Sequence, residues 1–92
     1  MTSVQPTARV VRLLDRPDSW AGRQTRLILE RARVDVDEWP WSAAEARTLA
    51  AMLGHHTPPV VVVCARTELS VVVVDHWAGL DLDRLRELAV RR

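Results

Sequence analysis

The sequence contains no lysine, tyrosine or phenylalanine, and it has a single cysteine, Cys64. One cysteine excludes an internal disulfide and any metal site that is built from several cysteines. No apolar run approaches the roughly 18 residues that a membrane span needs. The N-terminal residues MTSVQPTAR lack the apolar core of a signal peptide. We therefore expect a cytoplasmic protein that does not associate with membranes.

Charge and length restrict the function classes further. The 92 residues carry 13 basic and 12 acidic side chains, so the net charge of +1 gives no reason to expect a nucleic-acid partner. Three histidines are present, but His55 and His56 are adjacent and His76 is distant, a spacing unlike that of metal ligands. We expect no metal site, no cofactor and a single domain over residues 1–92, whose first seven residues are flexible.

The apolar periodicity predicts seven elements of secondary structure. Strands are expected over 8–14, 34–38, 60–65 and 70–77, and helices over 20–32, 43–53 and 82–89. Ser19, Ser42 and Asp81 stand where helix N-caps belong, and Gly54 stands where the second helix should end.

This order, β-α-β-α-β-β-α, predicts an α/β fold. The first β-α-β unit should form a right-handed parallel crossover, and the last two strands should form an antiparallel hairpin. The valine runs at 60–63 and 71–74 are typical of strands that are covered on both faces. We therefore predict a three-layer sandwich around a four-stranded mixed sheet.

The four tryptophans allow separate interpretations. Trp39 and Trp41 flank Pro40 in a predicted loop, which favours a surface patch. Trp20 begins a helix and serves as a contact residue if it is exposed, or as cover for that helix if it folds inward. Trp77 lies close to Gly79 and is expected to pack in the core.

Three segments resemble one family of proteins. "DRPDS" before a helix resembles the turn that precedes the redox pair of glutaredoxins, and "HTPPVVVV" resembles their segment with a cis-proline. "DHWAGLDLDRLRELA" resembles the end of NrdH-type redoxins, the small electron donors of ribonucleotide reductase. The resemblance extends from about Val10 to Ala89. It implies a thioredoxin-like fold with a cis peptide bond before Pro59.

The same resemblance places the two cysteines of the family's Cys-x-x-Cys motif on Ser19 and Gly22 of this chain. The motif is thus replaced by Ser-Trp-Ala-Gly, and a serine hydroxyl cannot take part in disulfide exchange. Cys64 follows four valines and is expected to be a buried, inert thiol. We therefore expect no dithiol reductase activity and assign no catalytic residue.

Two functions remain open for the start of the first helix. In one, the chain is a redox-inactive binding or protein-interaction module. In the other, Ser19 stabilises the thiolate of a small ligand such as glutathione, or residual electron transfer persists. Both use one predicted binding cleft, whose partner is an unidentified protein, peptide or small thiol. The residues of this cleft are Ser19, Trp20, Arg23, Thr57, Pro58 and Pro59.

The predicted fold leaves the strand over 70–75 at an edge of the sheet. A valine-rich edge strand that carries no inward charge or proline invites pairing with another chain. We therefore predict that a second copy, forming a homodimer, or a partner protein adds a strand there.

Overall fold

Four strands and three helices make up residues 8–91, the part of the chain that the computed structural model describes. The predicted flexibility of the first seven residues concerns positions outside this range. In chain order, the elements are β1 (Ala8–Asp15), α1 (Trp20–Arg31), β2 (Val36–Pro40), α2 (Ala44–Met52), β3 (Val60–Arg66), β4 (Val71–Ala78) and α3 (Leu82–Arg91). The predicted order β-α-β-α-β-β-α is confirmed.

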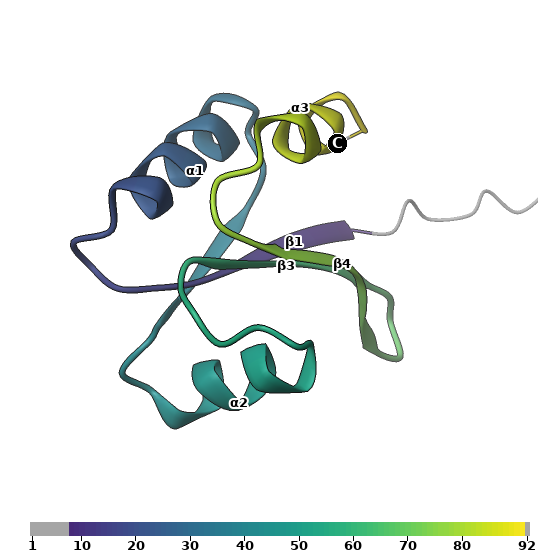
Figure 1. The fold of residues 1–92 in the computed structure, drawn as a ribbon. Helices are drawn as coiled ribbons and strands as arrows, with labels where there is room; N and C mark the ends of the chain where they lie inside the picture. Colours follow the sequence, from purple (N-terminus) through teal and green to yellow (C-terminus); the bar gives the residue numbers. More distant parts are fainter. Residues whose placement is uncertain (1–7, 92) are drawn as a thin grey trace, which may run out of the picture.

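The strands form one mixed sheet in the order β2-β1-β3-β4. β1 and β2 are parallel, with Leu13 opposite Glu38, whereas β3 is antiparallel to both β1 and β4. α1 and α3 cover one face of the sheet, and α2 covers the other (Figure 1). The predicted three-layer α/β sandwich is therefore correct.

Alternation along the strands divides the apolar core between the two faces of the sheet. The core beneath α1 and α3 includes Val11, Leu13, Leu29, Trp77 and Leu85. The core beneath α2 includes Leu14, Ala46, Ala50, Val60, Val62 and Cys64. Trp77 packs in the first core as predicted, and Cys64 is fully buried in the second.

The second strand begins two residues later than predicted because α1 ends in a hydrogen-bonded turn. Arg33 adopts a left-handed conformation with φ of 58°, and its N–H donates to Glu30 O. Val34 N–H donates to Leu29 O at 2.9 Å, and both side chains belong to the same core. This C-terminal motif keeps Val34 out of the strand.

The N-terminus of α2 differs from the prediction. Ala43, and not Ser42, is the N-cap residue, and it makes no side-chain cap hydrogen bond. Arg47 Nη1 instead donates to the carbonyl oxygens of Trp41 and Ser42, each at 2.8 Å. At the other end, Gly54 ends the helix with φ of 85°, as predicted.

The predicted surface patch of two loop tryptophans is wrong. Trp39 and Pro40 lie within β2, and Trp39 and Trp41 are partly buried against the core beneath α2. Trp39 Nε1 donates to Asp37 Oδ2 at 2.8 Å, and the guanidinium of Arg12 lies 4.6 Å from the centroid of the Trp39 ring. Both rings therefore anchor the edge of the sheet.

The two valine runs have opposite environments. Val60–Val63 in β3 is buried, as predicted, but the valines at 71–74 in β4 remain 37–53% exposed. β4 lies at the sheet edge, and a bulge interrupts its pairing between Val63 and Cys64. At its tip the hairpin of β3 and β4 bends away from α1 and α3, toward the side of the sheet on which α2 lies (Figure 1).

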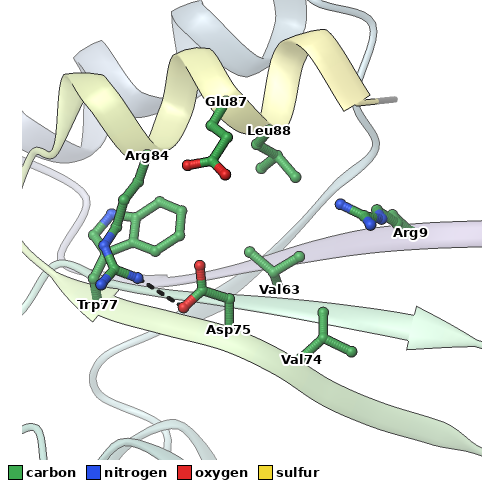
Figure 2. Close-up of a pocket in the computed structure, with 8 residues that line it drawn as sticks. All are labelled: Arg9, Val63, Val74, Asp75, Trp77, Arg84, Glu87 and Leu88. Carbon is green, nitrogen blue, oxygen red and sulfur yellow. Dashed lines mark hydrogen bonds and ion pairs between the residues drawn. The ribbon is translucent and has the colours of Figure 1, made fainter.

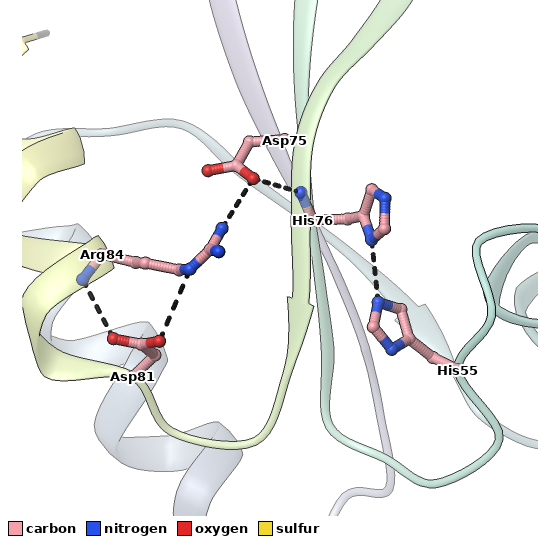
Figure 3. Close-up of polar contacts among 5 residues, drawn as sticks. All are labelled: His55, Asp75, His76, Asp81 and Arg84. Carbon is pink, nitrogen blue, oxygen red and sulfur yellow. Dashed lines mark hydrogen bonds and ion pairs between the residues drawn. The ribbon is translucent and has the colours of Figure 1, made fainter.

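A histidine pair connects the loop before β3 to β4. His55 Nε2 lies 2.8 Å from His76 Nδ1, with the two rings at 71° (Figure 3). Burial, then the neighbouring charges of His76 and His56, lower the pKa of His55 below its ordinary value of 6.5. The folded protein therefore favours the neutral form of His55.

We expect the Val73→Lys variant to be monomeric under conditions in which the wild type forms a dimer. A charge on the edge strand opposes pairing of β4 with a second copy. Sedimentation velocity across a concentration series measures the change. Val90→Lys, at a valine that is 85% exposed in α3, is the matched control and should leave the dimer intact. A monomeric wild type at high concentration would contradict the homodimer.

Acid should destabilise the protein partly through His55. Because its pKa is lower in the folded state, the unfolded state binds more protons, and stability is lost as the pH falls from about 6.5 through the lowered value. His55→Gln should therefore make the free energy of unfolding less dependent on pH between about 7 and 5. Urea titrations measure this slope, and His56→Gln should change it less. An unchanged slope in His55→Gln would contradict the expectation.

Candidate functional site

The first turn of α1 is organised by Ser19. Its side chain accepts a hydrogen bond from Gly22 N–H at 3.0 Å, and its carbonyl oxygen accepts from Arg23 N–H at 3.1 Å. Ser19 N–H in turn donates to Arg16 O at 3.3 Å, which closes the turn after β1. The interpretation of Ser19 as an N-cap is therefore confirmed.

The side chains around Ser19 differ in exposure. Trp20 is 61% exposed, which agrees with the contact interpretation and not with the inward one. Arg23 is also exposed, whereas Gly22 is buried. The helix corner thus presents an aromatic ring and a cation to solvent and turns its small residue inward.

The Thr57–Pro59 segment forms the other half of the predicted cleft. The peptide bond between Pro58 and Pro59 is cis, as the resemblance implied, and Pro59 O accepts from Gly79 N–H at 2.8 Å. Thr57 is exposed and Pro59 is buried. Within residues 8–91, no hydrogen bond joins this segment to the helix corner. Their use as one binding cleft therefore remains a prediction.

The described part of the chain has few other features that would indicate a redox site, a metal site or a membrane-spanning helix. Its one cysteine is buried in β3, and no Cys-x-x-Cys pair is present. Between residues 8 and 91, no three histidine, cysteine or acidic side chains converge as they would around a metal ion. Among the described helices, none has the length and hydropathy to cross a membrane.

Asp15, at the end of β1, is a feature that the sequence reasoning missed. The residue is only 7% exposed, and both of its carboxylate oxygens are buried without a hydrogen-bond partner among the described residues. The signal in the sequence is its alternation with Val11 and Leu13, which places Asp15 on the core-facing side of β1. A buried, unpaired carboxylate is energetically unfavourable, which makes it a candidate for function.

Gly22 makes room for this carboxylate. A Cβ built on Gly22 would overlap Asp15 Oδ2 and would lie 2.7 Å from Asp15 Cγ. The same position is 3.2 Å from Ser19 Oγ. The carboxylate therefore rests directly against the first turn of α1, where the helix dipole is positive.

Asp15 also lines a cavity of about 240 Å³ at the carboxyl ends of β1 and β2. Arg26 from α1 and Glu38 from β2 line the cavity as well, and they form an ion pair through Nη2 and Oε1. Arg26 Nε is buried and has no hydrogen-bond partner among the described residues. Two of the residues that line the cavity thus carry unpartnered polar atoms, and these atoms are themselves buried.

A second cavity of about 240 Å³ lies between α3 and the β3–β4 hairpin. Figure 2 shows its charged side chains, among them Asp75 and Arg84. Arg84 Nη1 donates to Asp75 Oδ1 at 2.7 Å, and Arg84 Nε lies 3.5 Å from Asp81 Oδ2 (Figure 3). Its central cation is already paired, in contrast to the carboxylate of Asp15.

Comparison with known proteins identifies the fold. No family model and no curated protein matches the sequence. A thioredoxin of Trichomonas vaginalis superposes with a TM-score of 0.67 at 14% identity, over 94% of this chain and 79% of that one.

Two other solved thioredoxins agree with this result. A Thermus thermophilus thioredoxin gives a TM-score of 0.61 at 18% identity, over 90% of this chain and 75% of that one. Thioredoxin f of spinach chloroplasts gives 0.61 at 20% identity, over 92% and 76%. At these identities, the likeness shows the fold alone. The chain has a thioredoxin-like fold with a single cysteine and no Cys-x-x-Cys pair.

Proposed function

We propose that this chain is a redox-inactive binding or protein-interaction module of the glutaredoxin and NrdH type. Ser19 and Gly22 occupy the two redox positions, and residues 1–92 act as one domain. Trp20 and Arg23 provide exposed contacts beside the Thr57–Pro59 segment. The partner is a protein, a peptide or a small thiol.

The observation that carries this proposal is the contact between Asp15 and Gly22. Any side chain at position 22 would collide with the carboxylate of Asp15. The place where a second thiol would stand is therefore filled by another residue. This contact is evidence against disulfide exchange in addition to the absence of the two cysteines, and it supports a binding function for the site.

The state of Ser19 supports the same proposal. Its oxygen is engaged as the cap of α1, a role that contributes about 1 kcal/mol to helix stability. Cys64 is buried in the core beneath α2, so its thiol does not face solvent. Neither residue offers an accessible nucleophile for disulfide exchange.

One alternative draws support from the same hydrogen bond. Because Ser19 Oγ accepts from Gly22 N–H, its own proton remains able to stabilise a ligand thiolate. Titration of the protein with glutathione, followed by calorimetry, distinguishes this thiol-handling alternative from the redox-inactive binding module. Glutathione binding that weakens in Ser19→Ala would favour the thiol-handling function.

The chain should show no disulfide reductase activity. In an assay that couples thioredoxin reductase and NADPH to insulin reduction, we expect turnover at the level of buffer, because both redox positions lack sulfur. A Cys64→Ser variant is the control and should behave identically. Turnover that survives Cys64→Ser would overturn the proposal, and turnover that this variant abolishes would indicate a monothiol reaction through Cys64.

Gly22→Ala should lower the free energy of unfolding by about 1–3 kcal/mol, because the added methyl group collides with Asp15. In an Asp15→Ala background the collision is absent. There, alanine should be neutral, or favourable by up to about 1 kcal/mol through its helix propensity.

Urea denaturation of the wild type, both single variants and the double variant measures this coupling. An equal effect of Gly22→Ala in the two backgrounds would show that Asp15 does not rest against the helix. The argument from position 22 would then fail.

A further inference from the structure

Two histidine side chains that are distant in the sequence meet between the α2–β3 loop and the edge strand. His55 follows the C-terminus of α2 and His76 lies in β4, yet His55 Nε2 is 2.8 Å from His76 Nδ1 (Figure 3). Two nitrogens that bind one metal ion at right angles, each at about 2.0 Å, lie about 2.8 Å apart. The spacing of the pair therefore matches two neighbouring positions around a transition-metal ion.

We propose that His55 Nε2 and His76 Nδ1 together bind a divalent transition-metal ion such as Ni²⁺ or Cu²⁺. Imidazole nitrogen suits both ions, and both take ligands at right angles in tetragonal geometry. Among residues 8–91, no third histidine, cysteine or acidic side chain joins the pair, so water or a small ligand completes the coordination. This site is additional to the proposed cleft and does not depend on it.

The backbone holds both histidines in place. His55 N–H donates to Ala50 O at 2.8 Å, directly after Gly54, whose φ of 85° turns the chain out of α2. His76 lies opposite Val62 in the antiparallel pairing of β3 and β4. The two ligands thus come from elements that are fixed independently, and only their rings need to turn so that both nitrogens point at one ion.

The hydrogen bond of the pair is compatible with metal binding. In the neutral pair one ring donates its proton to the other. The outer nitrogens, His55 Nδ1 and His76 Nε2, are not buried and make no hydrogen bond within residues 8–91. The donor ring can therefore carry its proton on its outer nitrogen, which leaves a free lone pair on both facing nitrogens without the loss of a proton.

The charges around the pair favour metal coordination over protonation. Burial, then His76 and His56, lower the pKa of His55, which keeps its ring neutral at pH 7, and metal ions bind the neutral ring. Asp75 precedes His76 but lies on the opposite face of β4, where Arg84 Nη1 donates to its Oδ1 at 2.7 Å. This carboxylate therefore does not stabilise a proton on the His76 ring.

The test is calorimetric titration of the full chain with Ni²⁺ at neutral pH, in a buffer that does not bind metals. Loss of a group that only orients a metal ligand already weakens binding by about 10–100-fold, so His55→Gln and His76→Gln should each weaken it at least about tenfold. The matched control is His56→Gln, at the exposed neighbour of His55, which should change the affinity less than about twofold.

Two results of this titration would overturn the proposal. One is equal affinity of the wild type and both ligand variants, which would place the ion elsewhere on the chain. The other is no binding by the wild type at about 1 mM Ni²⁺, where a dissociation constant of about 0.1 mM would give about 90% occupancy.

Two further measurements keep the test decisive if a variant is unstable. Because an ion that binds only the folded state stabilises it, Ni²⁺ should raise the thermal midpoint of the wild type and of His56→Gln, but not that of His76→Gln. If His76→Gln fails to fold, pulsed EPR of Cu²⁺ on the wild type decides, since it detects the outer nitrogen of each bound imidazole. Signals from two imidazoles support the site, and signals from one or none contradict it.

Discussion

The contact between the carboxylate of Asp15 and the backbone of Gly22 constrains the whole corner of the sheet. It places the end of β1 directly beneath the first turn of α1, with the carboxylate of Asp15 between them. Ser19 then caps the helix from the same side, because its Oγ borders the space that a Cβ of Gly22 would fill. Strand, turn and helix are thus fixed by one close approach that only glycine permits.

Much of the fold could be predicted from the sequence because its signals are local. Helical spacing, the caps at Ser19 and Asp81 and the stop at Gly54 depend on neighbours within a few residues. The errors arose where the composition and alternation of a segment do not record its contacts. Val34 leaves its strand because it packs with Leu29, a pairing that a left-handed arginine makes possible.

The second valine run illustrates the same limit. Four valines in β4 have the same composition as the four in β3, yet one run is buried and the other exposed. β3 is a central strand and β4 is an edge strand, a difference that composition does not record. Similarly, alternation with Val11 and Leu13 was available in the sequence to place Asp15 on the face beneath α1 and α3, but only the folded structure shows Gly22 against its carboxylate.

Thiol chemistry at this helix start would conflict with the carboxylate for an electrostatic reason as well as a steric one. A redox thiol at the N-terminus of a helix relies on the dipole to stabilise its thiolate. Here the carboxylate of Asp15 already lies at the positive end of the α1 dipole, and Ser19 Oγ lies close to the same position beside Gly22. A second anion at position 19 would be repelled by Asp15, and this repulsion is strong where water is excluded. The corner therefore favours a neutral hydroxyl at position 19, which is the group that it holds.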